Sequence, residues 1–194
     1  DNIGIWWQGA YGCWMKNVEL TRWGTFGIEL QYCASMEVRG CYVHDPNQFN
    51  WGKGYSMQLD PADTTLVVDN IFYRFQDGIL LQGGCSGNVI AYNCLFRSYP
   101  EYNGVDVMLS ALFGNHTPYP CYNLWEGNYA NQFHSDFYYG PSGYGTLLRN
   151  YFSGTEPEAT QNRICVNIDA HQRYYSVVGN ILGTPTAPES CCAP

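Results

Sequence analysis

Short stretches that alternate apolar and polar residues recur along the chain. Three of them begin at a glycine and end at a glutamine, at residues 27–31, 54–58 and 78–82. A period of two residues is typical of β-strands with one buried face, and no 3.6-residue periodicity competes with it. The pattern therefore predicts an all-β protein. The residues that it points inward are Ile28, Leu30, Tyr55, Met57, Ile79 and Leu81.

An asparagine recurs along the chain after short apolar segments, and at one of these repeated positions glycine replaces it. The repeated positions are Asn17, Gly40, Asn70, Asn93, Asn128, Asn150 and Asn180. Their intervals of 23, 30, 23, 35, 22 and 30 residues fit a base coil of about 22–23 residues with insertions in loops. We expect a single-stranded parallel β-helix of about seven coils. An antiparallel sandwich, the alternative, would not place one asparagine in every coil.

Asparagine and glycine share this position because both tolerate a left-handed backbone at a sharp bend. Stacked asparagine side chains can also satisfy one another's buried amides along a ladder. We therefore interpret residues 1–194 as one domain, with coils over about residues 3–182. Residues 183–194 form an irregular tail rich in proline and cysteine.

The composition argues against two classes of binding partner. The formal net charge is −8 and the only lysines are Lys16 and Lys53, which argues against nucleic acid and anionic membrane surfaces. No apolar run is long enough to span a membrane, and the chain opens without a basic and apolar leader. We expect a mature secreted protein.

Nine cysteines without a C-x-x-C pair favour disulfides in an oxidising compartment over a zinc ribbon. Because the number is odd, at least one thiol is left over or pairs between chains. The adjacent Cys191 and Cys192 suit an intermolecular link. A homo-oligomer, joined by a cysteine or by coil ends, is therefore one expectation.

Four segments carry a family resemblance: residues 13–19, 87–93, 124–128 and 146–150. With them the chain resembles the pectate-lyase-like right-handed parallel β-helix superfamily, most of all its uncharacterised bacterial secreted members. The resemblance implies a right-handed coil and a carbohydrate partner. Members cleave acidic polysaccharides by β-elimination, hydrolyse glycosides, or bind glycans without cleaving them. The few coils and the missing N-terminal cap helix differ from a typical member and suggest a fragment or a stacking unit.

Counting back 13–16 residues from each asparagine or glycine aligns the outward positions of the coils. One column reads Gln31, Gln58, Gln82, His116, Tyr138 and Asp169. The neighbouring column reads Glu29, Ser56, Leu80, Gly114, Asp136 and Asn167. The first three coils thus predict a glutamine ladder, either structural or used to bind sugar hydroxyls. The predicted substrate-binding residues are Glu29, Gln31, Gln58, Gln82, Asn167 and His171.

The later coils bring acid–base groups into line. The predicted catalytic residues are His116, Asp136, Tyr138 and Asp169. A glycosidase would use Asp136 and Asp169 as its carboxyl pair, whereas a lyase would move protons with the histidine or tyrosine. No metal site is assigned, but calcium on Asp136, Asn167 and Asp169 is an option. The alternative is a solvated polar face.

Three functions remain open. The first is an extracellular enzyme, a polysaccharide lyase or a glycoside hydrolase, with its groove on the long-strand face. The second is an adhesive β-helix that binds glycans without cleaving them, and the third is a filament subunit that stacks end to end. The sequence leaves catalysis itself undecided.

Overall fold

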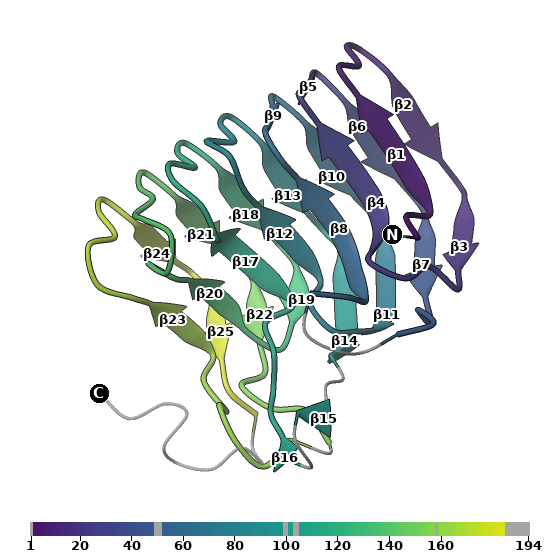
Figure 1. Ribbon diagram of the computed structural model, residues 1–194. Helices are drawn as coiled ribbons and strands as arrows, with labels where there is room; N and C mark the ends of the chain where they lie inside the picture. The colour runs from purple at the N-terminus through teal and green to yellow at the C-terminus, as the bar shows by residue number, and fades with distance from the viewer. Residues whose placement is uncertain (1, 49–51, 99–100, 103–104, 158, 185–194) are drawn as a thin grey trace.

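The computed structural model describes residues 2–48, 52–98, 101–102, 105–157 and 159–184. In this part of the chain all regular secondary structure is β-strand. Three sheets of seven parallel strands stack side by side, as Figure 1 shows from the purple N-terminal strands to the yellow C-terminal ones. Each coil gives one strand to each sheet, so the fold is the predicted parallel β-helix with seven coils.

Sheet 1 contains β1 (Ile5–Gln8), β4 (Phe26–Gln31), β8 (Tyr55–Leu59), β12 (Ile79–Leu81), β17 (Leu112–Asn115), β20 (Phe133–Ser135) and β23 (Val166–Ile168). Sheet 2 contains β2 (Trp14–Lys16), β6 (Glu37–Arg39), β10 (Leu66–Val68), β13 (Val89–Ala91), β18 (Leu124–Glu126), β21 (Thr146–Leu148) and β24 (Ser176–Val178). Sheet 3 contains β3 (Glu19–Thr21), β7 (Tyr42–His44), β11 (Ile71–Phe75), β14 (Cys94–Ser98), β19 (Tyr129–Ala130), β22 (Tyr151–Phe152) and β25 (Ile181–Leu182). Two short pairs complete the fold: β5 (Cys33–Ala34) with β9 (Ala62–Asp63), and β15 (Glu101–Tyr102) with β16 (Val105–Asp106).

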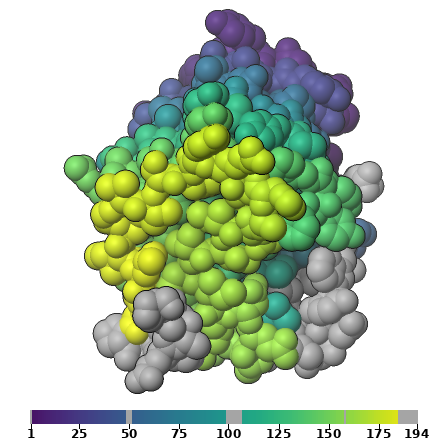
Figure 2. Space-filling view, turned by 90° about the vertical axis from the view of Figure 1, so that its left-hand side faces the viewer, coloured from purple at the N-terminus to yellow at the C-terminus, as the bar shows by residue number. Residues whose placement is uncertain are grey.

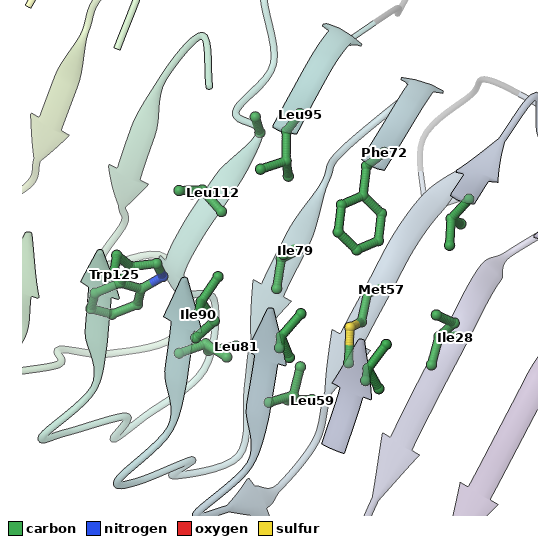
Figure 3. Close-up of a cluster of buried hydrophobic side chains, with 14 of the residues drawn as sticks. Ile28, Met57, Leu59, Phe72, Ile79, Leu81, Ile90, Leu95, Leu112 and Trp125 are labelled. Atoms are coloured by element: carbon green, nitrogen blue, oxygen red, sulfur yellow. The ribbon is translucent and has the colours of Figure 1, made fainter. Parts of the chain in front are cut away.

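The core runs along the inside of the coils. Ile28, Met57 and Ile79 are register partners on successive strands and are fully buried, in agreement with the period-two pattern. Figure 3 shows such rows, with Leu112 continuing the row of Ile28 and Met57. Tyr55 was predicted to point inward but is only half-buried, because it lies at the first position of β8. Side chains stacked in rows about 4.8 Å apart exclude water along the whole rod.

The asparagine ladder is present, and its register corrects the sequence alignment in the first two coils. Asn93 Nδ2 donates to Asn128 Oδ1 at 3.0 Å, and Asn128 Nδ2 donates to Asn150 Oδ1 at 2.9 Å. The ladder extends from Asn70 to Asn180. Lys16 pairs with Arg39 and Arg39 with Val68, so Asn17 and Gly40 precede the ladder position by one residue.

The left-handed bend also lies one residue before the ladder. Asn17 and Gly40 have φ values of 56° and 62°, and Asp69, Tyr92 and Arg149 share this conformation directly before ladder asparagines. The prediction that the repeated residue itself is left-handed is therefore wrong from Asn70 onward. Asparagine is retained there for its side-chain hydrogen bonds, while the residue before it makes the turn.

The three long intervals have a common origin. Residues 45–54, 99–111 and 153–165 all connect a strand of sheet 3 to the next strand of sheet 1. The insertions thus lie at one corner of the coil, as a solenoid predicts.

The cysteines differ from the expectation. Cys13, Cys33, Cys41, Cys85, Cys94 and Cys121 are free thiols within this chain, so the prediction of disulfides gains no support from these six. Cys191, Cys192 and most of the predicted tail lie outside the described residues. The described chain has no helix of the length and hydropathy that crossing a membrane requires.

The last coil leaves apolar side chains exposed. Val177, Val178, Ile181 and Leu182 are 43–63% exposed, and they lie on the final strands of sheets 2 and 3. Figure 2 shows this yellow end of the rod facing the viewer. The exposed positions fit the hypothesis of end-to-end stacking, which stays a hypothesis.

Candidate active site

A cavity of about 740 Å³ opens on the outer face of sheet 1, from Tyr55 on the third strand, β8, to Asp169 directly after the seventh strand, β23. Loop residues Gly52, Leu109 and Asn162 come from the three inserted connections and form part of its wall. Leu80 and Phe113, register partners on β12 and β17, line its floor. The insertions that lengthen three coils are therefore what makes the flat sheet concave.

The polar column at the ends of the sheet 1 strands differs from the predicted one. Backbone hydrogen bonds align Gln31, Asp60, Gln82, His116, Asp136 and Asp169 on successive coils. Asp136 thus occupies the place that was predicted for Tyr138. The error is a shift of two residues, which leaves unchanged which side chains point inward and is therefore invisible to the hydrophobic pattern.

The same shift removes the predicted glutamine ladder. Gln58 pairs in register with Glu29, and its Nε2 donates to Glu29 Oε1 at 3.2 Å. Gln31 instead accepts a hydrogen bond from Gln8 Nε2 at 2.8 Å. Gln82 follows Asp60 in the column, so the three glutamines do not form a continuous row.

All four predicted catalytic residues line the cavity: His116, Asp136, Tyr138 and Asp169. None of the predicted substrate-binding residues does, a set that comprises Glu29, Gln31, Gln58, Gln82, Asn167 and His171. Burial raises the pKa of Glu29, which is nearly covered by its neighbours. Asn167 pairs with His134 on the floor strand, and His171 lines a separate cavity of about 390 Å³ with Phe137. The roles assigned to these residues stay predictions.

His116 and Asp136 form the central pair. His116 Nδ1 donates to Asp136 Oδ2 at 2.6 Å, and the Tyr138 amide donates to Asp136 Oδ1 at 3.1 Å. The hydrogen bond to Asp136 raises the pKa of His116, which favours an imidazolium paired with a carboxylate. Both charges sit at the mouth of the cavity, with Asp136 largely buried and His116 partly open to solvent.

Aromatic rings enclose the imidazole of His116. The Tyr138 ring stacks on it with centroids 5.9 Å apart, and Tyr139 meets it edge-on at 5.1 Å. Phe113 contacts both His116 and His134. Rings of this kind give a sugar an apolar surface on which its C–H groups can pack, as well as hydroxyl groups to bond.

A second histidine–carboxylate pair follows on the next coils. His134 Nε2 donates to Asp169 Oδ2 at 3.2 Å, and Asp169 stands directly after Asp136 in the column. The described residues contain no cluster of three or more His, Cys, Asp and Glu side chains that could hold a metal. Asp136 and Asp169 each face an imidazole instead, so the calcium option gains no support.

Asp77 was not among the predicted site residues, although it lines the same cavity. It precedes β12 in a Gln-Asp-Gly segment that reads as a turn. Burial raises its pKa to about 7, with a further increase from the charge of Asp136 and an opposing effect from His116. Only the packing of three coils and their loops around this carboxyl makes it unusual.

Comparisons with known proteins agree with the fold. A family profile described as "Right handed beta helix region" matches residues 1–117, and the chain belongs to this family. No curated protein matches it. Among solved structures it is similar to DFA-IIIase from Arthrobacter chlorophenolicus A6 in complex with DFA-III, with 12% identity and a TM-score of 0.62. The C387A mutant of that enzyme, also with DFA-III, gives the same two values.

The chain is covered to 98% in both comparisons but spans only 46% of the mutant chain and 45% of the other. At this identity the similarity shows the fold alone. The right-handed parallel β-helix predicted from the sequence is thereby confirmed.

Proposed function

We propose that this protein binds a neutral carbohydrate in the sheet 1 cavity and hydrolyses a glycosidic bond there. The observation that carries the proposal is the composition of the cavity, in which three carboxyl groups meet aromatic rings. Asp77, Asp136 and Asp169 are the carboxyls, and Phe113 and Tyr138 are among the rings. Glycoside hydrolysis needs one carboxyl that gives a proton and one that is ionised, within a site that grips a sugar.

Similar solved structures support a carbohydrate as the ligand. Two solved structures that are similar to this chain are of DFA-IIIase in complex with DFA-III, a sugar. We extend only the chemical class to this chain, because its cavity has its own donors and rings. We also propose that the protein acts outside the cell, as the superfamily resemblance implies.

Charge favours a hydrolase of neutral sugars over a uronate lyase. No lysine or arginine is among the residues that line this cavity in the described part of the chain. A lyase must neutralise the carboxylate of a uronic acid, and the cationic group here, His116, is already paired with Asp136. An acidic polymer would therefore meet carboxyl groups and no unpaired lysine or arginine in the described lining of this cavity.

The test is an activity screen on DFA-III and on neutral and acidic oligosaccharides. Hydrolysis is measured by the release of reducing ends, and β-elimination by the ultraviolet absorbance of unsaturated products. His116→Ala and Asp136→Asn should each lower the hydrolysis rate by about 100-fold or more, since acid–base groups contribute at that level. His44→Ala and Asp45→Asn are matched controls, because His44 Nδ1 bonds Asp45 Oδ2 at 2.8 Å on sheet 3, away from the cavity.

Hydrolysis by the wild type, lost in the first two variants and kept in the controls, supports the proposal. A folded wild-type protein that cleaves none of these sugars overturns it. Unsaturated products from a uronate polymer would instead identify a lyase.

A further inference from the structure

Asp77 is a carboxyl group buried at the cavity without a hydrogen-bond partner for one of its oxygens. The residue is 5% exposed, and its Oδ1 has no partner among the described residues. Tyr55, Ser110 and Leu80 line the same cavity. Asp77 Oδ1 is thus shielded from bulk water and adjoins the space that a ligand would fill.

A buried carboxyl oxygen without a hydrogen-bond partner lowers the stability of the folded protein. A buried polar atom without a partner costs on the order of 1–3 kcal/mol, and an ionised one costs more. The backbone offers no structural reason for it, since the carbonyl of Asp77 already accepts from the Ser56 amide at 2.9 Å. An apolar residue or an asparagine could hold the same turn, so the carboxyl itself calls for an explanation in terms of a ligand.

The surroundings favour a neutral, proton-bearing carboxyl. Burial is the main cause of its raised pKa, and it outweighs the opposing charge of His116, while Asp136, which lines the same cavity, raises the pKa further. Asp136 itself is held as hydrogen-bond acceptor by His116 and by the Tyr138 amide. One cavity therefore contains a carboxyl that favours its protonated form and a second carboxyl that accepts hydrogen bonds from two donors.

We propose that Asp77 is the catalytic residue that donates a proton to the leaving oxygen of the glycosidic bond. This inference rests on the proposed function. The Asp77 O–H bond breaks and its proton passes to the glycosidic oxygen, while the bond from that oxygen to the anomeric carbon breaks and its electron pair stays on the leaving alcohol. Water adds to the anomeric carbon and gives its proton to Asp136. Proton exchange with solvent then restores both groups.

The experiment compares two leaving groups in the full chain. Asp77→Asn should slow hydrolysis of an ordinary oligosaccharide by about 100-fold or more. With a dinitrophenyl glycoside, whose leaving group needs no proton, the same variant should lose less than about tenfold in kcat. The wild type should lose activity as the pH rises through the pKa of Asp77, and this loss should be absent from Asp77→Asn and shifted in Asp77→Glu.

Asp60→Asn is the matched control. Asp60 directly follows β8 of sheet 1, whereas Asp77 precedes β12 of the same sheet. Burial raises the pKa of Asp60 as it does that of Asp77, but Asp60 does not line the cavity. It should keep the wild-type rates on both substrates. Thermal melts of both variants confirm that they fold.

Each outcome has a separate meaning. A wild type that cleaves neither substrate overturns the proposed function and this inference with it. An active wild type whose Asp77→Asn variant loses activity equally on both substrates, or retains activity on the oligosaccharide, overturns this inference alone. An Asp60→Asn variant with the same pattern as Asp77→Asn also contradicts it.

Discussion

At the scale of single residues, the cavity combines two ionisable groups whose pKa values move in the same direction for opposite reasons. The pKa of Asp77 is raised by burial, because removal from water penalises the charged form of the carboxyl. The pKa of His116 is raised by the hydrogen bond from its ring to Asp136, because this bond stabilises the imidazolium form of the histidine. A neutral acid and a charged pair therefore coexist in one site around neutral pH.

The titration of Asp77 should make the free energy of unfolding depend on pH. In the unfolded chain this carboxyl ionises near pH 4, whereas in the folded chain it keeps its proton to about pH 7. Between these values the folded state holds more protons, so this group's contribution to stability is lost as pH rises, on the order of 1.4 kcal/mol per unit. The gain in unfolding free energy from Asp77→Asn should consequently grow from pH 4 to pH 7. Urea unfolding at several pH values measures it, and a difference that is independent of pH would contradict the buried, protonated carboxyl.

His116 gives a second test with its own pH range. Because its pKa is raised in the folded chain, its pairing with Asp136 stabilises the protein fully below the unfolded value near 6.5. This stabilisation is lost as pH rises through the folded value. His116→Gln should remove that part of the pH dependence and leave the part due to Asp77. Nuclear magnetic resonance of the imidazole protons of His116 follows the titration directly.

At the scale of elements, the ladder shows what each coil contributes to the next. Asn128 Oδ1 accepts from both the amide and the Nδ2 of Asn93, and Asn128 Nδ2 donates to the Ile90 carbonyl. These groups are buried, so none of them can turn to water if the asparagine is removed. The ladder therefore connects three coils through one side chain.

Asn128→Ala should lower the unfolding free energy by about 3 kcal/mol or more, because it leaves several buried donors and acceptors unpaired. Asn17→Gly is the control, since Asn17 lies before the ladder in a left-handed conformation that glycine adopts readily. It should change stability by less than about 1 kcal/mol. Denaturant unfolding of both variants measures the two changes in unfolding free energy. Equal losses in the two variants would contradict a special role of the ladder position in stability.

The register of these elements marks the limit of prediction from one sequence. Period-two alternation identified Ile28, Met57 and Ile79 as core residues, because burial imposes that period on every strand. It could not separate Asp136 from Tyr138 in the column, because a shift of two residues keeps the same faces inward. Asp77 lay beyond reach for another reason: its environment comes from loops far apart in the sequence.

At the scale of the whole molecule, regular coils and irregular loops have separate tasks. The repeated strands build a rod whose outer face is flat, and the three insertions at one corner turn part of it into a cavity. The repeat was readable because it recurs seven times. The cavity was not, because each insertion occurs once and its shape depends on packing against the others.

Charge at this scale leads to the last prediction. The chain carries a net charge of −8, and the cavity adds carboxyls without a lysine or arginine in its described lining. Binding of a neutral oligosaccharide should change less than about twofold between low and high salt, since no net charge is brought together. An oligogalacturonate of equal length should bind weakly at low salt and more tightly at high salt, because ions screen the repulsion. Titration calorimetry with both ligands measures this, and tight uronate binding that weakens with salt would require a cationic site in place of the neutral sugar site proposed here.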